Sequence, residues 1–157
     1  MKNMKIKQEH FIDYIRKNKT DHKEYIRIIR MLIKHTDAVC FTIKPFLDKV
    51  DEFYHSIWSA MRFSVLDYGY AESAIDEAGK KSCMILLRTD YELYDFMQNR
   101  KNLFDFGQED PYFGFALENP AFIKDGEVFC YTISHEEICL VTKSVYEQLC
   151  KISECIF

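Results

Sequence analysis

The residues best suited to metal chemistry are His135, Glu136 and Glu137, which are followed by Ile138 and Cys139. A His-Glu pair with a second histidine four positions after the first forms a zinc-protease site when all three lie on a helix. The fifth position here is Cys139, and the apolar runs on either side predict a hairpin, which would not bring the first and fifth positions onto one face. We therefore expect an exposed turn histidine, with neither a metal site nor a cofactor.

A cysteine nucleophile would need a nearby base, and the five histidines are scattered along the chain without a family signature around any cysteine. No two of the six cysteines have Cys-x2-Cys spacing, and four lie in apolar runs, where burial raises the thiol pKa: Cys40, Cys83, Cys130 and Cys139. The chain also lacks a Gly-rich phosphate loop, a Walker sequence and a Gly-x-Ser-x-Gly elbow. The sequence thus argues against an enzyme. A small-molecule enzyme ranks third, after the two binding functions described below. It would need a pocket holding His135 or His55 beside carboxylates.

Charge is unevenly distributed along the chain. Residues 1–35 carry ten Lys and Arg against four Asp and Glu, a formal charge of +6, which leaves −10 for residues 36–157 in a chain of net charge −4. The basic segment could hold phosphate, since Arg27 and Arg30 share one face of a predicted helix. The interpretation that we favour is that these cations solvate the outer side of an amphipathic helix and pair with the acidic remainder of the chain. Binding of nucleic acid or a regulatory partner is therefore the second alternative, although the net negative charge makes nucleic acid the weaker of the two.

Length and composition predict one domain spanning residues 1–157. The chain is 48% hydrophobic and has only three Pro and five Gly, far from a disordered composition. No apolar run approaches the roughly 18–20 residues that would cross a bilayer, and no apolar stretch follows the basic start. We expect a cytoplasmic protein with reduced thiols and no membrane partner, and homo-oligomerisation stays open.

The first half of the chain predicts three helices and a strand. Apolar residues recur at helical spacing from Gln8 to Lys34, and residues 18–21 interrupt them with Thr20 or Asp21 as the second N-cap, so we expect a helical pair. A strand follows at 38–43, and a helix begins after Pro45 and runs to Met61. Residues 67–81, which contain Gly and acidic side chains, predict an irregular connection.

The second half predicts strands that end in a hairpin. A buried strand is expected at 83–87, a short helix capped by Thr89 or Asp90 ends near Asn99, and an aromatic loop covers 102–119. Lys124 to Glu127 form a turn signal ahead of strands at 128–133 and 138–141, with 121–123 as a third strand. Both faces of 128–133 are apolar, so this strand should lie inside the sheet. A helix capped by Thr142 or Ser144 closes an α+β domain with N-terminal helices and a mixed sheet.

The chain resembles the small immunity proteins of bacterial toxin systems, including those of contact-dependent inhibition. The likeness lies in a short acidic domain rich in Tyr and Phe, without a catalytic signature, and in the passage from Asp125 to Glu136, Asp-Gly-Glu-Val-Phe-Cys-Tyr-Thr-Ile-Ser-His-Glu. The resemblance implies a protein that binds a cognate toxin domain and occludes its active site. It assigns no residue, because these families share no binding motif.

An acidic surface would suit such a role. Many toxin domains are nucleases with basic clefts, and acidic side chains among aromatic rings would supply steering charge and buried anchors. The first candidate surface is Asp105, Glu109, Asp110 and Tyr112, and the second is Asp67, Glu72, Asp76 and Glu77.

Overall fold

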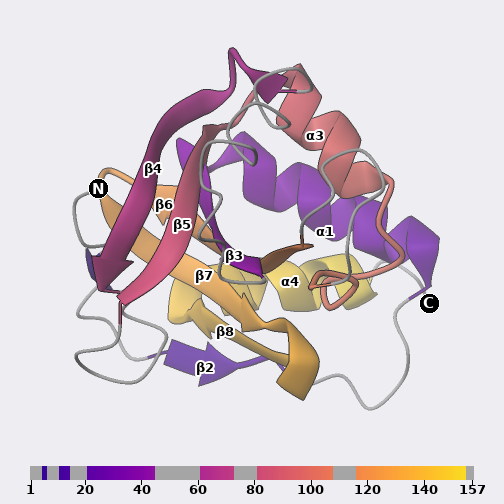
Figure 1. Ribbon diagram of the computed structural model, residues 1–157. Helices are drawn as coiled ribbons and strands as arrows, with labels where there is room; N and C mark the ends of the chain where they lie inside the picture. The colour runs from indigo at the N-terminus through magenta and orange to yellow at the C-terminus, as the bar shows by residue number, and fades with distance from the viewer. Residues whose placement is uncertain are drawn as a thin grey trace.

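The computed structural model describes residues 5–6, 11–14, 21–44, 61–72, 81–107 and 116–154 (Figure 1). The strands are β1 (Lys5–Ile6), β2 (Phe11–Asp13), β3 (Ala38–Lys44), β4 (Val65–Glu72), β5 (Lys81–Arg88), β6 (Ala116–Lys124), β7 (Glu127–Ile133) and β8 (Ile138–Thr142). The helices are α1 (His22–Lys34), α3 (Tyr91–Gln98) and α4 (Lys143–Glu154), with a short 3-10 turn at Ser134–Glu136. Within these residues, no helix combines the length and the apolar character needed to cross a membrane.

One sheet joins all the strands. Its order is β2-β8-β7-β6-β3-β5-β4, with antiparallel neighbours throughout, and β1 adds a short parallel pairing to β7. β7 lies between β6 and β8, as its two apolar faces predict. The predicted α+β fold is confirmed, including the C-terminal hairpin and the closing helix.

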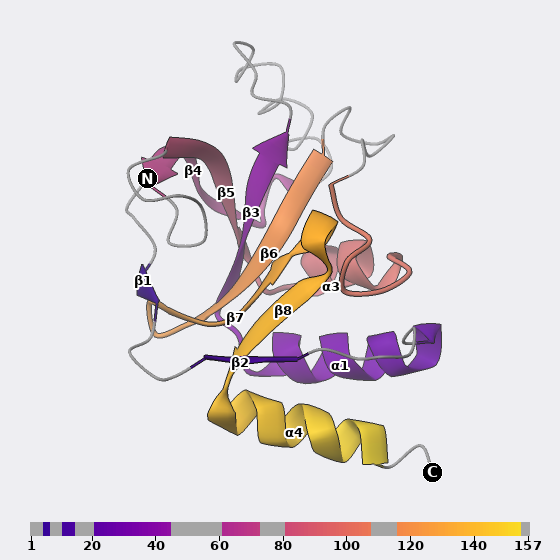
Figure 2. The ribbon, with the colours of Figure 1, turned by 90° about the horizontal axis from the view of Figure 1, so that it is seen from below.

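The three helices pack against one side of the sheet, with α1 between α3 and α4 (Figures 1 and 2). α1 begins where the sequence predicts, because the Asp21 carboxylate accepts a hydrogen bond from the Glu24 amide at 2.8 Å. Its inner face is fully buried and carries Tyr25, Ile28, Ile29 and Leu32. This helix face and the inward side chains of the central strands make up the main core.

The β6–β7 turn is a further point where sequence and structure agree. Asp125 and Gly126 have φ of 52° and 79°, the left-handed conformations that a two-residue hairpin turn requires. Asp37, just before β3, binds the turn from outside. Its carboxylate accepts hydrogen bonds from Lys124 Nζ at 2.8 Å and from the Asp125 amide at 2.9 Å. The turn is thereby tied to the end of α1.

The predicted helix around Phe11 and Ile12 is wrong. These residues form β2, which pairs with β8, and the Phe11 ring lies 5.4 Å from the Tyr131 ring. Three apolar residues at helical spacing do not fix a helix when a free sheet edge offers hydrogen-bond partners. The predicted helix after Pro45 lies outside the described residues except for its last residue, Met61.

Two predicted loops are also partly wrong. Of residues 67–81, expected to be irregular, 67–72 belong to β4, where Gly69 at φ 145° sits within the strand, and Lys81 begins β5. Residues 73–80 lie outside the described residues. The predicted loop 102–119 ends early, because β6 already begins at Ala116. Asn119, at φ 52°, stays inside β6 because its side chain accepts a hydrogen bond from the Ser134 amide at 2.8 Å. Gly and Asn mark turns only where no neighbouring strand competes for the backbone.

Candidate functional site

The large apolar side chains that stay exposed in the described part of the chain lie along the β4 edge of the sheet and at the start of α3. Phe63 and Tyr91 are each 72% exposed, and Leu66 and Tyr70 are 47% and 48% exposed. Three of them lie on or just before β4, the last strand of the sheet. We call Phe63, Leu66, Asp67, Tyr70 and Tyr91 the β4 edge surface.

A hydrogen bond joins the residue before β4 to the N-cap of α3. Ser64, which is fully buried, donates from its hydroxyl to the Asp90 carboxylate at 2.7 Å. The other Asp90 oxygen accepts from the Leu93 amide at 3.0 Å and so caps α3. Phe63 and Tyr91 are the chain neighbours of this bonded pair, so both rings emerge at the same corner of the fold.

The edge itself is poorly suited to pairing with another strand. A register shift between Val65 and Asp67 places Leu66 at an irregularity, and the Asp67 carboxylate accepts a hydrogen bond from the Tyr68 amide at 2.9 Å. Irregularities and charges of this kind protect edge strands from extra pairing. A partner at this edge would therefore contact side chains. The Arg62 guanidinium, 4.5 Å from the centre of the Phe63 ring, adds a cation beside the aromatic surface.

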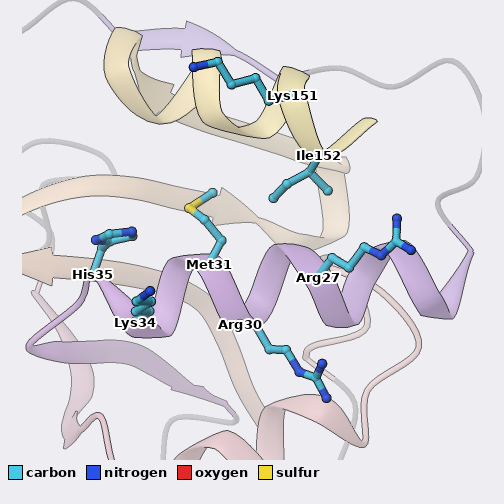
Figure 3. Close-up of a pocket in the computed structure, with 7 residues that line it drawn as sticks. All are labelled: Arg27, Arg30, Met31, Lys34, His35, Lys151 and Ile152. Atoms are coloured by element: carbon cyan, nitrogen blue, oxygen red, sulfur yellow. The ribbon is translucent and has the colours of Figure 1, made fainter. Parts of the chain in front are cut away.

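A second, very different feature is a groove between α1 and α4, with a cavity volume of about 630 Å³ (Figure 3). Met31 and Ile152 point toward each other across the gap between the helices (Figure 3). The remaining lining side chains are basic: Arg27, Arg30, Lys34, His35 and Lys151. We call this set of seven residues the basic groove.

The cations of the basic groove form no ion pair with a carboxylate among the described residues, where Lys124 and His135 are the cations seen in ion pairs. Arg30 contacts a side chain of α3, because its Nε donates to the Tyr94 hydroxyl at 2.9 Å. The solvated-helix interpretation of these residues predicts ion pairs with the acidic remainder, and none forms within the described ranges. The groove is a local concentration of positive charge.

His135 occupies the turn that the sequence predicts, and it is exposed. Its Nδ1 lies 3.4 Å from Glu118 Oε1, and its Nε2 lies 3.5 Å from Glu136 Oε1. Glu118 is a buried carboxylate that packs closely on Gly107, where an added Cβ would lie 3.3 Å from Glu118 Oε1. Among the described residues, no three metal-binding side chains converge on one point. His135 is therefore an exposed imidazole beside a buried carboxyl group.

The four cysteines in apolar runs are buried, as the sequence predicts. Cys40, Cys83, Cys130 and Cys139 are buried and unoxidised. Burial raises the pKa of Cys40 and Cys83. The pKa of Cys130 is raised well above its usual value, mainly by its contact with Cys139, whose Sγ lies 4.0 Å away, and also by burial. The raised pKa values make Cys40, Cys83 and Cys130 poor nucleophiles at neutral pH.

Most of the predicted acidic surface lies outside the described residues, namely Glu109, Asp110, Tyr112, Asp76, Glu77 and the Glu72 side chain. Asp105 is half-buried, and its carboxylate accepts a hydrogen bond from the Lys101 amide at 2.8 Å in the segment after α3. Asp67 is exposed on β4. β4 and the segment after α3 lie apart in both views (Figures 1 and 2), so these two described members are not neighbours.

The sequence indicated part of each feature and missed the rest. Asp67 and the cations of α1 were candidates, whereas Phe63, Leu66, Tyr70 and Tyr91 were not. The edge residues fall in or beside a segment whose Gly and Asp content suggests a loop, which hides the strand. Lys151 joins the basic groove only through the packing of α4 on α1, and no local pattern signals that contact.

Comparison with known protein families, curated proteins and solved structures finds no match to this chain.

Proposed function

We propose that this protein is a protein-binding module, and that its partner is a cognate toxin domain that docks on the β4 edge surface. The observation that carries the proposal is the exposure of Phe63, Leu66 and Tyr70 along one edge strand, with Tyr91 beside the start of that strand. Exposed Phe and Leu are unfavourable in water, and clustered apolar side chains on a protein surface mark interaction sites.

The composition of this surface supports a protein partner. Tyrosine and arginine are among the residues that contribute most to binding energy at interfaces, because they bury a large area at a small entropy cost. Arg62 already rests on the Phe63 ring. The Ser64–Asp90 bond joins the backbone segments that carry Phe63 and Tyr91, which reduces the ordering of these two segments that a partner would require.

Charge supports a basic partner. Residues 36–157 carry 11 basic and 21 acidic side chains, and Asp67 lies within the β4 edge surface. A protein whose active-site cleft is built for a polyanion has the complementary sign, so it would be steered toward this part of the chain. A nuclease toxin has this property, and covering its cleft would neutralise it.

We expect the gene immediately upstream to encode a secreted protein with a variable C-terminal toxin domain. The test is binding to that domain, measured by surface plasmon resonance and by residual toxin activity. Replacing Phe63 and Tyr70 together by serine should weaken binding by at least about tenfold, which corresponds to about 1.4 kcal/mol. The loss should appear mainly as faster dissociation. Phe63→Tyr with Tyr70→Phe keeps both rings and should bind like the parent.

A second pair of variants tests the charge argument. Charge reversal at Glu109 and Asp110 should slow association and flatten its dependence on ionic strength. Asp105 is left intact because its carboxylate binds the Lys101 amide. Parental binding by the serine variant would refute the β4 edge as the docking surface, and an unchanged salt dependence would refute steering by Glu109 and Asp110.

A further inference from the structure

We propose that the basic groove binds a phosphorylated small molecule of nucleotide size. This site lies on α1 and α4, away from the β4 edge surface, and it does not depend on the proposed function. The ligand class follows from three observations: the sign of the lining charge, the volume of the cavity and the apolar pair at its centre.

The positive charge of the lining residues favours an anionic ligand. Arg27, Lys34, His35 and Lys151 are exposed, and no described carboxylate lies within ion-pair distance of them. These cations repel one another in a protein whose net charge is −4, where acidic partners are abundant. A ligand with two or more negative charges would relieve this repulsion, and arginine binds phosphate oxygens through two parallel hydrogen bonds.

The geometry limits the size of the ligand. From Arg27 to His35 the helix advances about 12 Å, and the cavity volume is about 630 Å³, within the range typical of small-molecule sites. Arg30 lines the groove with its stem only, because its guanidinium points away from α4 toward α3, where Nε donates to the Tyr94 hydroxyl (Figure 3). Phosphate groups would lie along α1, against these cations.

Met31 and Ile152 provide the second half of the recognition. They point toward each other between the two helices and form an apolar floor within a basic rim (Figure 3). Such a floor suits the flat, weakly polar part of a ligand such as a nucleobase, since methionine adapts to irregular shapes and contacts rings favourably. Inorganic polyphosphate would use the rim alone.

A small ligand fits better than a nucleic acid polymer. A long polyanion would extend beyond the groove over a molecule whose residues 36–157 have a formal charge of −10. Each added phosphate outside the groove would therefore meet repulsion, whereas a compact ligand places all its charge against the basic residues.

The experiment is isothermal titration calorimetry of the full chain with three probes: adenosine triphosphate, inorganic triphosphate and adenosine, all without divalent metal. Adenosine triphosphate should bind most tightly, inorganic triphosphate more weakly and adenosine not measurably. Replacing Arg27 and Lys34 together by alanine should weaken binding of adenosine triphosphate at least tenfold. Met31→Ser should weaken binding of adenosine triphosphate and leave inorganic triphosphate unchanged.

Two controls make the result specific to the groove. Arg88 and Lys143 are exposed basic residues outside it, so Arg88→Ala with Lys143→Ala removes the same charge and should bind like the parent. Arg27→Lys with Lys34→Arg keeps the charge and should retain most of the affinity. Circular dichroism verifies that each variant is folded.

The proposal is overturned if neither triphosphate binds, or if the two alanine pairs weaken binding equally. It is also overturned if a single-stranded oligonucleotide without terminal phosphate binds more tightly than adenosine triphosphate and competes with it, because the ligand would then be a nucleic acid strand. None of these results bears on binding at the β4 edge surface.

Discussion

The basic groove and the β4 edge surface differ in what holds them in place. Apart from Lys151 on α4, the groove cations project from α1 or its C-cap, and the opposite face of α1 is fully buried in the main core. The β4 side chains project from a strand that is paired on one side only, with β5. A helix backed by a core presents charge at fixed spacing, whereas an edge strand can adjust its side chains to a partner.

The difference also concerns the energy that each surface can supply. Exposed charges attract a ligand over a Debye length but contribute little when solvated. Exposed rings contribute only on contact, through the area that they bury. The two surfaces thus suit different ligands: a small anion for the groove and a protein for the edge.

The largest expected effect tests whether the core beneath α1 contributes more to stability than the core beneath the edge strand β4. Leu32 is fully buried beneath α1, so Leu32→Ala should lower the free energy of unfolding by about 2–5 kcal/mol through loss of contacts and a residual cavity. Val65 is half-buried at the start of β4. Val65→Ala should lower the free energy of unfolding by only about 1 kcal/mol. Urea titration compares the two, and equal losses would contradict the distinction.

A smaller effect concerns the corner where β4 meets α3. Asp90→Ala removes both the α3 cap and the acceptor of the Ser64 hydroxyl, and should cost about 1–2 kcal/mol. Ser64→Ala removes only the second bond and should cost about 1 kcal/mol. If the corner aligns Phe63 with Tyr91, both variants also weaken the toxin complex. Intact affinity for the toxin would show that the two rings act separately, while affinity for triphosphate serves as the control.

The smallest effect provides a reference outside both surfaces. The pKa of Asp37 is lowered in the folded protein, mainly by the hydrogen bond from Lys124 and secondly by the hydrogen bond from the Asp125 amide. Asp37 therefore stabilises the fold at neutral pH, and this contribution disappears as the pH falls below the ordinary aspartate value. Because Asp37 is half exposed, Asp37→Asn should be only slightly less stable at pH 7. Thermal denaturation should show the difference closing at acidic pH, and a gap that widens on acidification would contradict the assigned cause.

Much of the fold is predictable because several local signals agree. Asp21 and Asp90 start helices through side-chain hydrogen bonds within three residues. Asp125 and Gly126 supply the positive φ that the β6–β7 turn needs. These interactions are short in sequence, so the residue types alone reveal them.

The missed elements depend on partners far away in the chain. Phe11 and Ile12 are extended because β8, more than a hundred residues later, pairs with them. Residues 67–72 are extended because β5 pairs with them, despite Gly69. The candidate sites follow the same rule: the α1 cations are visible as a pattern, whereas Lys151 and the corner formed by Ser64 and Asp90 arise only from tertiary packing.

The position of β3 has a consequence for synthesis of the chain. Both of its neighbours, β5 and β6, come later in the sequence, and β6 ends at Lys124. During translation, Val39, Phe41 and Ile43 thus leave the ribosome long before either flanking strand exists to cover them. Such delayed pairing slows folding and leaves apolar surface open to aggregation. The two sides of β3 are therefore covered in sequence, first by β5 and then by β6, once the chain beyond residue 116 has emerged.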